Sequence, residues 1–404
     1  MADGTVIENE VAIKVVGSDV AVYPTFDEMG LHEDLLRGVY AKGFQTPSNI
    51  QQRGIVPIKD GHDILAQAQS GTGKTGTFII GGVSRIDPAI KKVQILVLAP
   101  VRELAAQIGG IARDLTKFMN NKAGLNVHCA TGGEPLRDDI RAIEKGCQIL
   151  IGTPGRIFDL MNRNVLSRDA IRVLILDEAD QMLEDRFKEQ VLCILDKGFP
   201  ANVQVALFSA TMPEEVLDVA KVLLRNPVKI LVDAQQVPLD GIKQYYVELE
   251  KEDWKVDVLC DLYKQLTISQ ALIYCNTRQG VDRLAEKMRQ NGFPLAVIHG
   301  EMSVEERKAR MLEFRNGGVR VMISTDMLAR GIDVQQVSLV INYELPSKRE
   351  DYIHRIGRAG RFGRKGVTIN FIATADDKQG KAEIEEKWKH QMEILPQDLA
   401  SVMS

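Results

Sequence analysis

A glycine-rich loop that carries a lysine and a threonine is the first feature of this sequence that could do chemistry. In AQAQSGTGKTGTF, Gly71, Gly73 and Lys74 follow a predicted strand and open a predicted helix. Glycines let backbone N–H groups surround phosphates, the lysine reaches the β- and γ-phosphates, and a threonine hydroxyl can ligate Mg²⁺. Ala68 stands where the common loop has glycine, so this is a variant loop. The residues expected to bind phosphate are Ser70, Gly71, Thr72, Gly73, Lys74 and Thr75.

Three acidic side chains at the end of an apolar strand form the second such feature. VLILDEAD places Asp177, Glu178 and Asp180 around one small residue. Asp177 is positioned to hold Mg²⁺ through its hydration shell, and Glu178 can orient and activate the attacking water. The alternative is a helix that simply begins with acidic residues. A phosphate loop in the same chain favours the hydrolytic interpretation.

A basic stretch late in the chain can supply the positive charge that phosphoryl transfer needs. HRIGRAGR covers residues 354–361 and contains no acidic residue. We expect Arg358 and Arg361 to act as arginine fingers on the γ-phosphate. The alternative is a solvated basic loop. Because these arginines belong to a different predicted domain from the loop, hydrolysis would require the two domains to close.

The composition excludes several classes of protein. With 45% hydrophobic and 26% charged residues, the 404-residue chain has the composition of an ordinary folded protein. No apolar run approaches the roughly 20 residues that cross a bilayer, and the N-terminus lacks a signal sequence, so we expect an intracellular protein without membrane contact. Five cysteines without a CxxC pair argue against disulfides and zinc. A net charge of -4 means that any nucleic-acid site must be local.

Short apolar runs alternate with longer amphipathic segments from Phe26 onward, which predicts an α/β fold with parallel sheets and crossover helices. The strands expected in one sheet are residues 62–68, 94–99, 148–152, 172–177 and 203–208. Those expected in a second sheet are residues 271–275, 320–325, 338–343 and 367–373. Between the sets, at 226–241, a short strand runs into a stretch without helical periodicity. We therefore place an interdomain linker at 233–240.

After residue 23 the motifs follow the order of a known family. The chain resembles DEAD-box RNA helicases in GFQTPSNIQ, the phosphate loop, PVREL, TGG, TPGR, DEAD, SAT, NTR, STDMLARGIDV and HRIGRAGR. The resemblance implies two tandem RecA-like domains with a cleft between them, at 24–232 and 241–404, after a flexible extension at 1–23. It also implies ATP and Mg²⁺ as cofactors, and RNA-stimulated hydrolysis of ATP to ADP and phosphate.

The same resemblance assigns the remaining nucleotide contacts. It implies that Phe44 stacks on adenine, that Gln51 hydrogen-bonds the edge of the base, and that Phe26 supports the pocket. The backbone of Thr46 is expected nearby. The residues expected to reach the nucleotide from the second domain are Asp333, Arg358, Arg361 and Phe362.

The resemblance also implies contacts to the RNA backbone. Arginines offer bidentate donors, and glycine-rich turns let backbone N–H groups approach phosphates. The expected RNA-binding residues are Pro100, Arg102, Gly132, Gly133, Thr153, Pro154, Gly155, Arg156, Asn276, Arg278 and Thr325. Such contacts imply single-stranded RNA with little sequence preference, told from DNA by its 2′-OH. Val101 replaces the family's usual threonine and removes a hydroxyl.

Five residues are expected to couple the nucleotide site to RNA. The hydroxyls of the SAT motif can bridge the DEAD acids to a neighbouring segment. For His354 an interdomain hydrogen bond is favoured over metal ligation, because no second histidine or cysteine lies at ligand spacing. The coupling residues are Asp180, Ser209, Thr211, Arg330 and His354.

Within the family, IQQR, DVQQVSLVINY and YIHRIGR resemble the initiation factor 4A group. PTFDEMGLHEDLLRGVY and EKEDWKVDVLCDLY resemble its exon-junction-complex paralogue more closely. We therefore expect an ATP-gated RNA clamp in mRNA processing that is monomeric when free and is held by exon-junction partners. We expect it in the nucleus, with shuttling to the cytoplasm. The alternative is a cytoplasmic translation-initiation helicase that unwinds mRNA 5′ leaders with a cap-binding scaffold protein. A small-molecule kinase would leave DEAD and HRIGRAGR unexplained.

Overall fold

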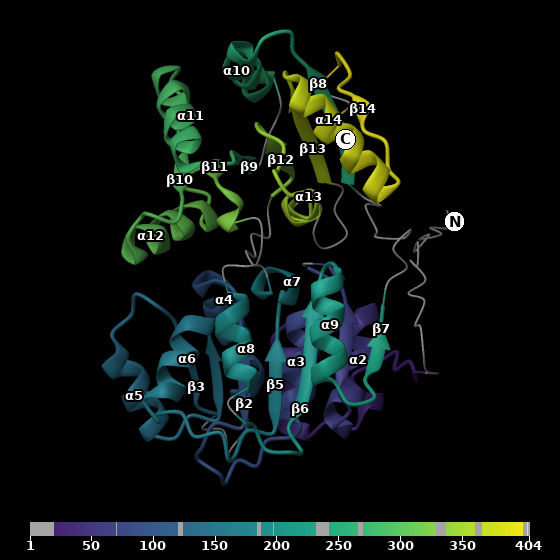
Figure 1. Ribbon diagram of the computed structural model, residues 1–404, viewed down its shortest axis with the longest axis vertical. Helices are drawn as coiled ribbons and strands as arrows, with labels where there is room; N and C mark the ends of the chain where they lie inside the picture. The colour runs from purple at the N-terminus through teal and green to yellow at the C-terminus, as the bar shows by residue number, and fades with distance from the viewer. Residues whose placement is uncertain are drawn as a thin grey trace, which may run out of the picture.

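The chain folds into two domains, each a parallel sheet covered by helices, which lie one above the other in Figure 1. The computed structural model describes residues 20–69, 71–119, 124–183, 187–196, 198–231, 242–265, 270–328, 337–359, 366–398 and 402. The predicted linker at 233–240 and residues 1–19 of the predicted extension lie outside the described residues. Within the described ranges, no helix is long and apolar enough to cross a membrane.

The first sheet has the strand order β3-β4-β2-β5-β6-β1-β7, with every pair parallel. Its strands are β1 (Ile64–Gln67), β2 (Ile95–Leu98), β3 (Val127–Ala130), β4 (Ile149–Gly152), β5 (Val173–Leu176), β6 (Gln204–Ser209) and β7 (Val228–Ile230). Parallel strands bring their carboxyl ends to one edge of the sheet. The phosphate loop, the DEAD acids and the SAT motif, which follow β1, β5 and β6, therefore share that edge.

Alternate strand residues of this sheet pack into two separate cores. One face carries Ile95, Ile175 and Phe208, and the other carries Leu96, Leu174 and Leu207. The helices of the first face are α1 (Glu33–Ala41), α2 (Asn49–Asp60), α3 (Lys74–Val83) and α4 (Arg102–Thr116). The helices of the second face are α5 (Leu136–Glu144), α6 (Pro154–Asn162), α7 (Ala179–Met182), α8 (Lys188–Asp196) and α9 (Glu214–Leu223). Burial on both faces explains why these strands are apolar throughout.

The second domain repeats this architecture with the order β10-β11-β9-β12-β13-β8-β14, again all parallel. Its strands are β8 (Ile242–Glu248), β9 (Ala271–Tyr274), β10 (Ala296–Ile298), β11 (Val321–Ser324), β12 (Leu339–Asn342), β13 (Gly366–Ile372) and β14 (Glu393–Ile394). One face is covered by α10 (Lys255–Gln265) and α11 (Arg278–Gln290). The other is covered by α12 (Val304–Arg315), α13 (Arg349–Ile356) and α14 (Ala375–Trp388). Single turns of 3-10 helix lie at Asp27–Met29, Glu252–Trp254 and Asp326–Leu328.

All nine strands expected from long apolar runs are present, and the short strand expected between the sets is β7. The sequence prediction did not include β3, β8, β10 and β14. Two of these are poorly buried, because every residue of β14 is exposed and three of the four residues in β3 are only half-buried. Strand β8 carries only two buried residues, and β10 is three residues long. Each of these strands is short or partly exposed, so its own sequence signal is weak, and its position is set by pairing with a neighbouring strand.

Gly38 is the point where α1 lies against α4. A Cβ atom built at Gly38 would overlap the backbone carbonyl of Leu115. Gly110, on α4 itself, is different, since a Cβ atom there would have no neighbour within 4 Å. Gly38 is therefore required by close backbone packing, whereas Gly110 is not.

Alanine at these two glycines is expected to change stability in opposite directions. Gly38→Ala forces α1 away from α4 and should lower the free energy of unfolding by about 1–3 kcal/mol. Gly110→Ala should raise it by about 0.5–1 kcal/mol, because alanine loses less backbone entropy in a helix. Urea titrations followed by far-UV circular dichroism measure both changes. Equal effects of the two substitutions would contradict the packing role of Gly38.

Candidate functional site

The phosphate loop joins the end of β1 to the start of α3. Gly71 and Gly73 both have left-handed backbone angles, with φ of +88° and +102°. A Cβ atom at Gly73 would lie 2.7 Å from Ser48 Oγ and 2.9 Å from the amide nitrogen of Gln51. Glycine is therefore required at this position both by conformation and by space. Ser70 lies outside the described residues, and Thr72 donates its hydroxyl to the carbonyl of Gln69 at 2.7 Å.

Lys74 opens α3 and points its ammonium at the DEAD acids. Its Nζ lies 2.9 Å from Glu178 Oε1 and 3.9 Å from Asp177 Oδ1, and all three side chains are buried. Burial lowers the pKa of Lys74, but the charges of Glu178 and Asp177 outweigh this and hold it above its usual value. Lys74 is therefore charged and supplies the positive charge that the buried acids require.

The two acids beside Lys74 have opposite pKa shifts. Burial raises the pKa of Asp177 to about 7, since Lys74 offsets only part of the lost hydration. Burial acts on Glu178 in the same direction, but the charges of Lys74 and His354 outweigh it and hold the pKa of Glu178 below its usual value. The closer approach of Lys74 to Glu178 explains the difference. Glu178 is therefore the more readily ionised of the pair.

Glu178 also has an unusual backbone. Its φ of +54° lies in the left-handed region. This conformation is unfavourable for residues other than glycine, and it occurs often at functional sites. Its Oε2 atom is buried without a hydrogen-bond partner among the described residues. Asp177 directly follows β5 with a carboxylate oxygen 3.9 Å from the Lys74 ammonium, and Thr75 is the next residue of α3. Carboxylates, a hydroxyl and an unpartnered buried oxygen form a donor set that suits hydrated Mg²⁺ and a water.

Asp180 connects the acids to the SAT motif and to the second domain. Its Oδ2 atom accepts a hydrogen bond from Thr211 Oγ1 at 2.6 Å, and the backbone N–H of Asp180 donates to Ser209 Oγ at 3.1 Å. His354 Nε2, from α13 of the second domain, lies 3.2 Å from the same Asp180 oxygen. Helix α13 faces α7 across the domain boundary in Figure 1. Four of the five expected coupling residues therefore meet here, and Arg330 lies outside the described residues.

Of the expected arginine fingers, only Arg358 is described. Its side chain is buried, and its Nε atom donates to the carbonyl of His354 at 3.2 Å, at the end of α13. Arg361, Phe362 and Asp333 lie outside the described residues. Arg358 is thus placed beside the histidine that touches the DEAD acids.

Arg355 is a residue whose role the sequence analysis missed. Its guanidinium donates to both carboxylate oxygens of Asp326 at 2.5 and 2.8 Å, and to Asn276 Oδ1 at 2.8 Å. It also contacts Asn342 and the carbonyl of Glu344, and lies 5.1 Å from the centre of the Tyr274 ring. Arg355 therefore holds together the strand ends that carry the NTR and STD motifs. Sequence could not reveal this, because four arginines occur close together and only tertiary packing determines which one turns inward.

The segment expected to read adenine is joined to the phosphate loop. Gln51 is buried, accepts the backbone N–H of Ser48 at 2.9 Å and donates to the carbonyl of Gly73 at 3.4 Å. Phe26 is fully buried in the core of the first domain and meets Tyr40 edge-on, with ring centres 6.3 Å apart. Phe44 is half-buried beside Gly76, and Thr46 is exposed. The structure therefore places Gln51 and Phe44 beside the loop, whereas the roles of Phe26 and Thr46 stay predictions.

The RNA-binding residues expected in the first domain gather at the turns before α4, α5 and α6. Arg102 begins α4, and a Cβ atom at Gly133 would lie 2.7 Å from its Nη1 atom. Arg156 on α6 pairs with Asp139 and donates to the carbonyl of Glu134 at 2.7 Å. Burial, together with the charges of Arg307 and Arg156, lowers the pKa of Arg102 despite two neighbouring acids. The other members here are Pro100 and Gly132, with Thr153, Pro154 and Gly155 at the start of α6.

In the second domain the expected RNA-binding residues follow neighbouring strands. Asn276 comes after β9 and Thr325 directly after β11, which pairs with β9. Arg278 begins α11 and pairs with Glu301 on the surface. A further arginine, Arg307 on α12, was not expected. It is buried and lies 3.0 Å from Glu103 of α4, so it joins the two domains beside the proposed RNA residues.

Comparisons with known proteins agree with this arrangement. The DEAD/DEAH box helicase model matches residues 48–219, and the helicase conserved C-terminal domain matches residues 254–363. The ATP-dependent RNA helicase eIF4A of Chaetomium globosum is 52% identical over 94% of both chains. Eukaryotic initiation factor 4A of Drosophila melanogaster is 50% identical over 95% of this chain and 93% of its own.

The chain belongs to the DEAD-box helicase family. It is an ATP-hydrolysing RNA helicase, and both domains are RecA-like, as the sequence predicted. Dbp5 of S. cerevisiae bound to RNA and ADP BeF3 superimposes with a TM-score of 0.87 at 34% identity, covering 94% of this chain and all of that one. A Dbp5 variant bound to Gle1 and IP6 gives 0.77. The two domains of this DEAD-box helicase are thus arranged as in the RNA-bound relative.

The expected exon-junction identity is wrong. Relatives that cover nearly all of the chain, from fungi, Drosophila melanogaster and Caenorhabditis elegans, carry the name of initiation factor 4A. The two segments that suggested the paralogue form α1 and α10 with their preceding turns. Their apolar residues, such as Leu35 and Leu259, pack into the core of their own domain. Such a pattern reports helix packing, which does not distinguish one biological role from another.

Val101 occupies the N-cap position of α4, with no side-chain hydrogen bond to the first turn. Its side chain packs against the core of the first domain. A threonine could accept a backbone N–H there, and a side-chain N-cap typically contributes about 1 kcal/mol. The departure from the family pattern therefore leaves the helix that begins with Arg102 uncapped.

Val101→Thr is expected to raise the free energy of unfolding by about 1 kcal/mol, because it caps α4. Urea unfolding monitored by far-UV circular dichroism measures the change. Val222→Thr on the exposed surface of α9 is the control, with an expected change within about 0.5 kcal/mol. A lower stability of Val101→Thr would mean that its core contact outweighs the cap.

Proposed function

We propose that this protein is a translation-initiation RNA helicase, in which ATP and single-stranded RNA close the two domains to separate short duplexes in mRNA 5′ leaders. The observation that carries the proposal is the contact between His354 and Asp180. It joins the second domain to the buried acids around Lys74, so hydrolysis depends on closure. The names of the relatives support the translation role.

Each residue of the nucleotide site has a distinct part in this proposal. Lys74 binds the β- and γ-phosphates when it leaves Glu178, and Glu178 is then free to orient the attacking water. Thr75 and Asp177 would hold Mg²⁺, which would neutralise phosphate charge. Arg358, with Arg361, adds positive charge from the second domain. Phe44 and Gln51 bind the base.

RNA is gripped by its backbone in this proposal. Arg102 and Arg156 lie at turns that contact α12 of the second domain. Asn276 binds Arg355, the neighbour of the histidine that contacts Asp180, and Thr325 directly follows β11. One RNA strand would contact residues of both domains. Backbone contacts carry little sequence information, and the 2′-OH distinguishes RNA from DNA. Closure therefore depends on the phosphate and ribose groups of RNA and depends little on its base sequence.

The proposed protein partner is a cap-binding scaffold, and the free protein is a monomer. The nuclear location expected from the sequence rested on the exon-junction identity and has lost that support. The translation role goes with the cytoplasmic alternative, which stays a prediction. Fluorescence imaging of the tagged protein tests it.

Glu178→Gln is expected to lower RNA-stimulated ATP hydrolysis by a factor of about 10²–10⁴, because the general base is lost while Lys74 still binds phosphate. Phosphate release with RNA, with DNA and without nucleic acid measures the effect. Glu214→Gln, in the first turn of α9, is the control. Equal hydrolysis by the wild-type enzyme under all three conditions would exclude an RNA-dependent ATPase.

The translation role has a separate test in a cell-free extract depleted of this protein. Added wild-type protein should restore translation of an mRNA with a hairpin in its 5′ leader much more than that of an mRNA with a short unstructured leader. Glu178→Gln should restore neither. Restoration that is independent of leader structure would contradict the proposed role.

A further inference from the structure

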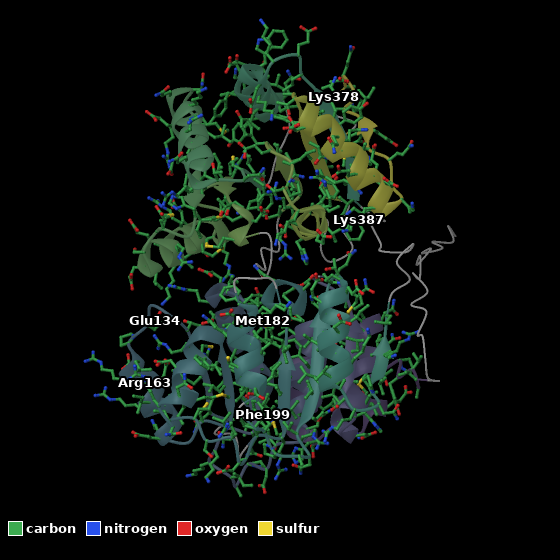
Figure 2. The ribbon with its side chains drawn as sticks, in the orientation of Figure 1. Glu134, Arg163, Met182, Phe199, Lys378 and Lys387 are labelled. Carbon is green, nitrogen blue, oxygen red and sulfur yellow. The ribbon has the colours of Figure 1, made fainter. Side chains whose placement is uncertain are left out.

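Glu134 lies between an expected RNA-binding arginine and the second domain. Its backbone carbonyl accepts a hydrogen bond from Arg156 Nη2 at 2.7 Å. Its carboxylate pairs with Lys308 on α12. Figure 2 shows Glu134 on the side of the first domain that faces α12. One residue therefore touches both the RNA site of the first domain and the helix that closes on it.

The orientation of Arg156 depends on this turn. Its Nη1 atom donates to Asp139, a buried carboxylate that also lies 2.6 Å from His128 Nε2. Its Nη2 atom donates to the Glu134 carbonyl at 2.7 Å. The Asp139 carboxylate and the Glu134 carbonyl are two fixed acceptors, and together they hold the planar guanidinium in one orientation. Movement of Glu134 would remove one of them.

The turn that carries Glu134 is itself tightly packed. Gly133 has a φ of +87°, and a Cβ atom there would lie 2.7 Å from Arg102 Nη1 and 2.8 Å from Val304 Cγ2. Val304 begins α12, so the second domain lies directly against the turn. The neighbouring pair of Arg307 and Glu103 fixes the same end of α12 on α4. Docking of α12 therefore bears on both RNA-binding arginines of the first domain.

We propose that Glu134 is a positioning residue for RNA binding: Lys308 captures its carboxylate on domain closure, which fixes the turn and holds Arg156 in its RNA-binding orientation. The proposal rests on the RNA role of Arg156 given above. By linkage, if closure tightens the grip on RNA, RNA must favour closure by the same factor. An exposed ion pair contributes modestly, so the expected effect is a few-fold change in RNA affinity.

Reversing the charges one at a time and together tests the pair. Lys308→Glu and Glu134→Lys should each raise the RNA concentration that half-saturates ATP hydrolysis about two- to fivefold. The double variant should return to within about twofold of the wild-type value, because the pair re-forms with exchanged charges. The half-saturating ATP concentration should change less than the RNA value in every variant.

Glu134→Lys is the decisive variant. A nonspecific charge effect predicts tighter RNA binding, because the substitution adds positive charge beside RNA. The proposed pairing predicts weaker binding, because two lysines would then face each other and resist closure. Lys378→Glu is the matched control, since Lys378 pairs with Glu248 within the second domain and lies at the far end of that domain in Figure 2. It should leave the RNA value unchanged.

Arg156→Ala separates the failure of this inference from failure of the proposed function. If Arg156→Ala weakens RNA binding while the charge reversals do not, or if the double variant is no better than the singles, Glu134 has no positioning role and the helicase proposal stands. If Arg156→Ala does not change RNA binding, the positioning role of Glu134 is overturned, because that role acts through Arg156. Wild-type hydrolysis that does not respond to RNA overturns both proposals.

Discussion

The burial of three carboxylates beside one lysine is the constraint on which the rest of this site depends. Asp177, Glu178 and Asp180 are almost completely removed from water at the carboxyl end of β5. Charged groups in such a place require close partners. Lys74 supplies one to Glu178, and the Thr211 hydroxyl of the SAT motif supplies another to the Asp180 carboxylate. Because the buried acids require these partners, the phosphate loop and the SAT motif must lie next to each other.

The second domain also supplies a partner for the buried acids. Adjacent residues of α13 face different ways, since His354 reaches across to Asp180 while Arg355 turns into its own domain and binds Asp326. Through Arg355, the helix is tied to the strand ends that carry Asn276. A change in the contact between His354 and Asp180 would therefore move Arg355 and, with it, Asn276, which is expected to bind RNA. This connection is the path that we propose for the coupling between ATP and RNA.

The biological role was the part of the prediction that failed. The segments that resembled the exon-junction paralogue are amphipathic helices and their entry turns, and their buried residues serve the cores of the two domains. Packing requirements of that kind are shared by helicases with different tasks. Partner choice is determined instead by exposed side chains, which leave no periodic signal in a single sequence.

The sequence by itself determined the fold class, the two-domain division and the position of the phosphate loop, because the glycine spacing of the loop and the apolar runs of strands buried on both faces are visible in the local sequence. It could not identify the edge strands β3 and β14, whose residues are partly exposed and pair only where a neighbour exists. Nor could it separate Arg355 from Arg358, or find Arg307 and Glu134. Those roles depend on contacts between residues far apart in the chain, and only the tertiary structure decides which charged side chains meet.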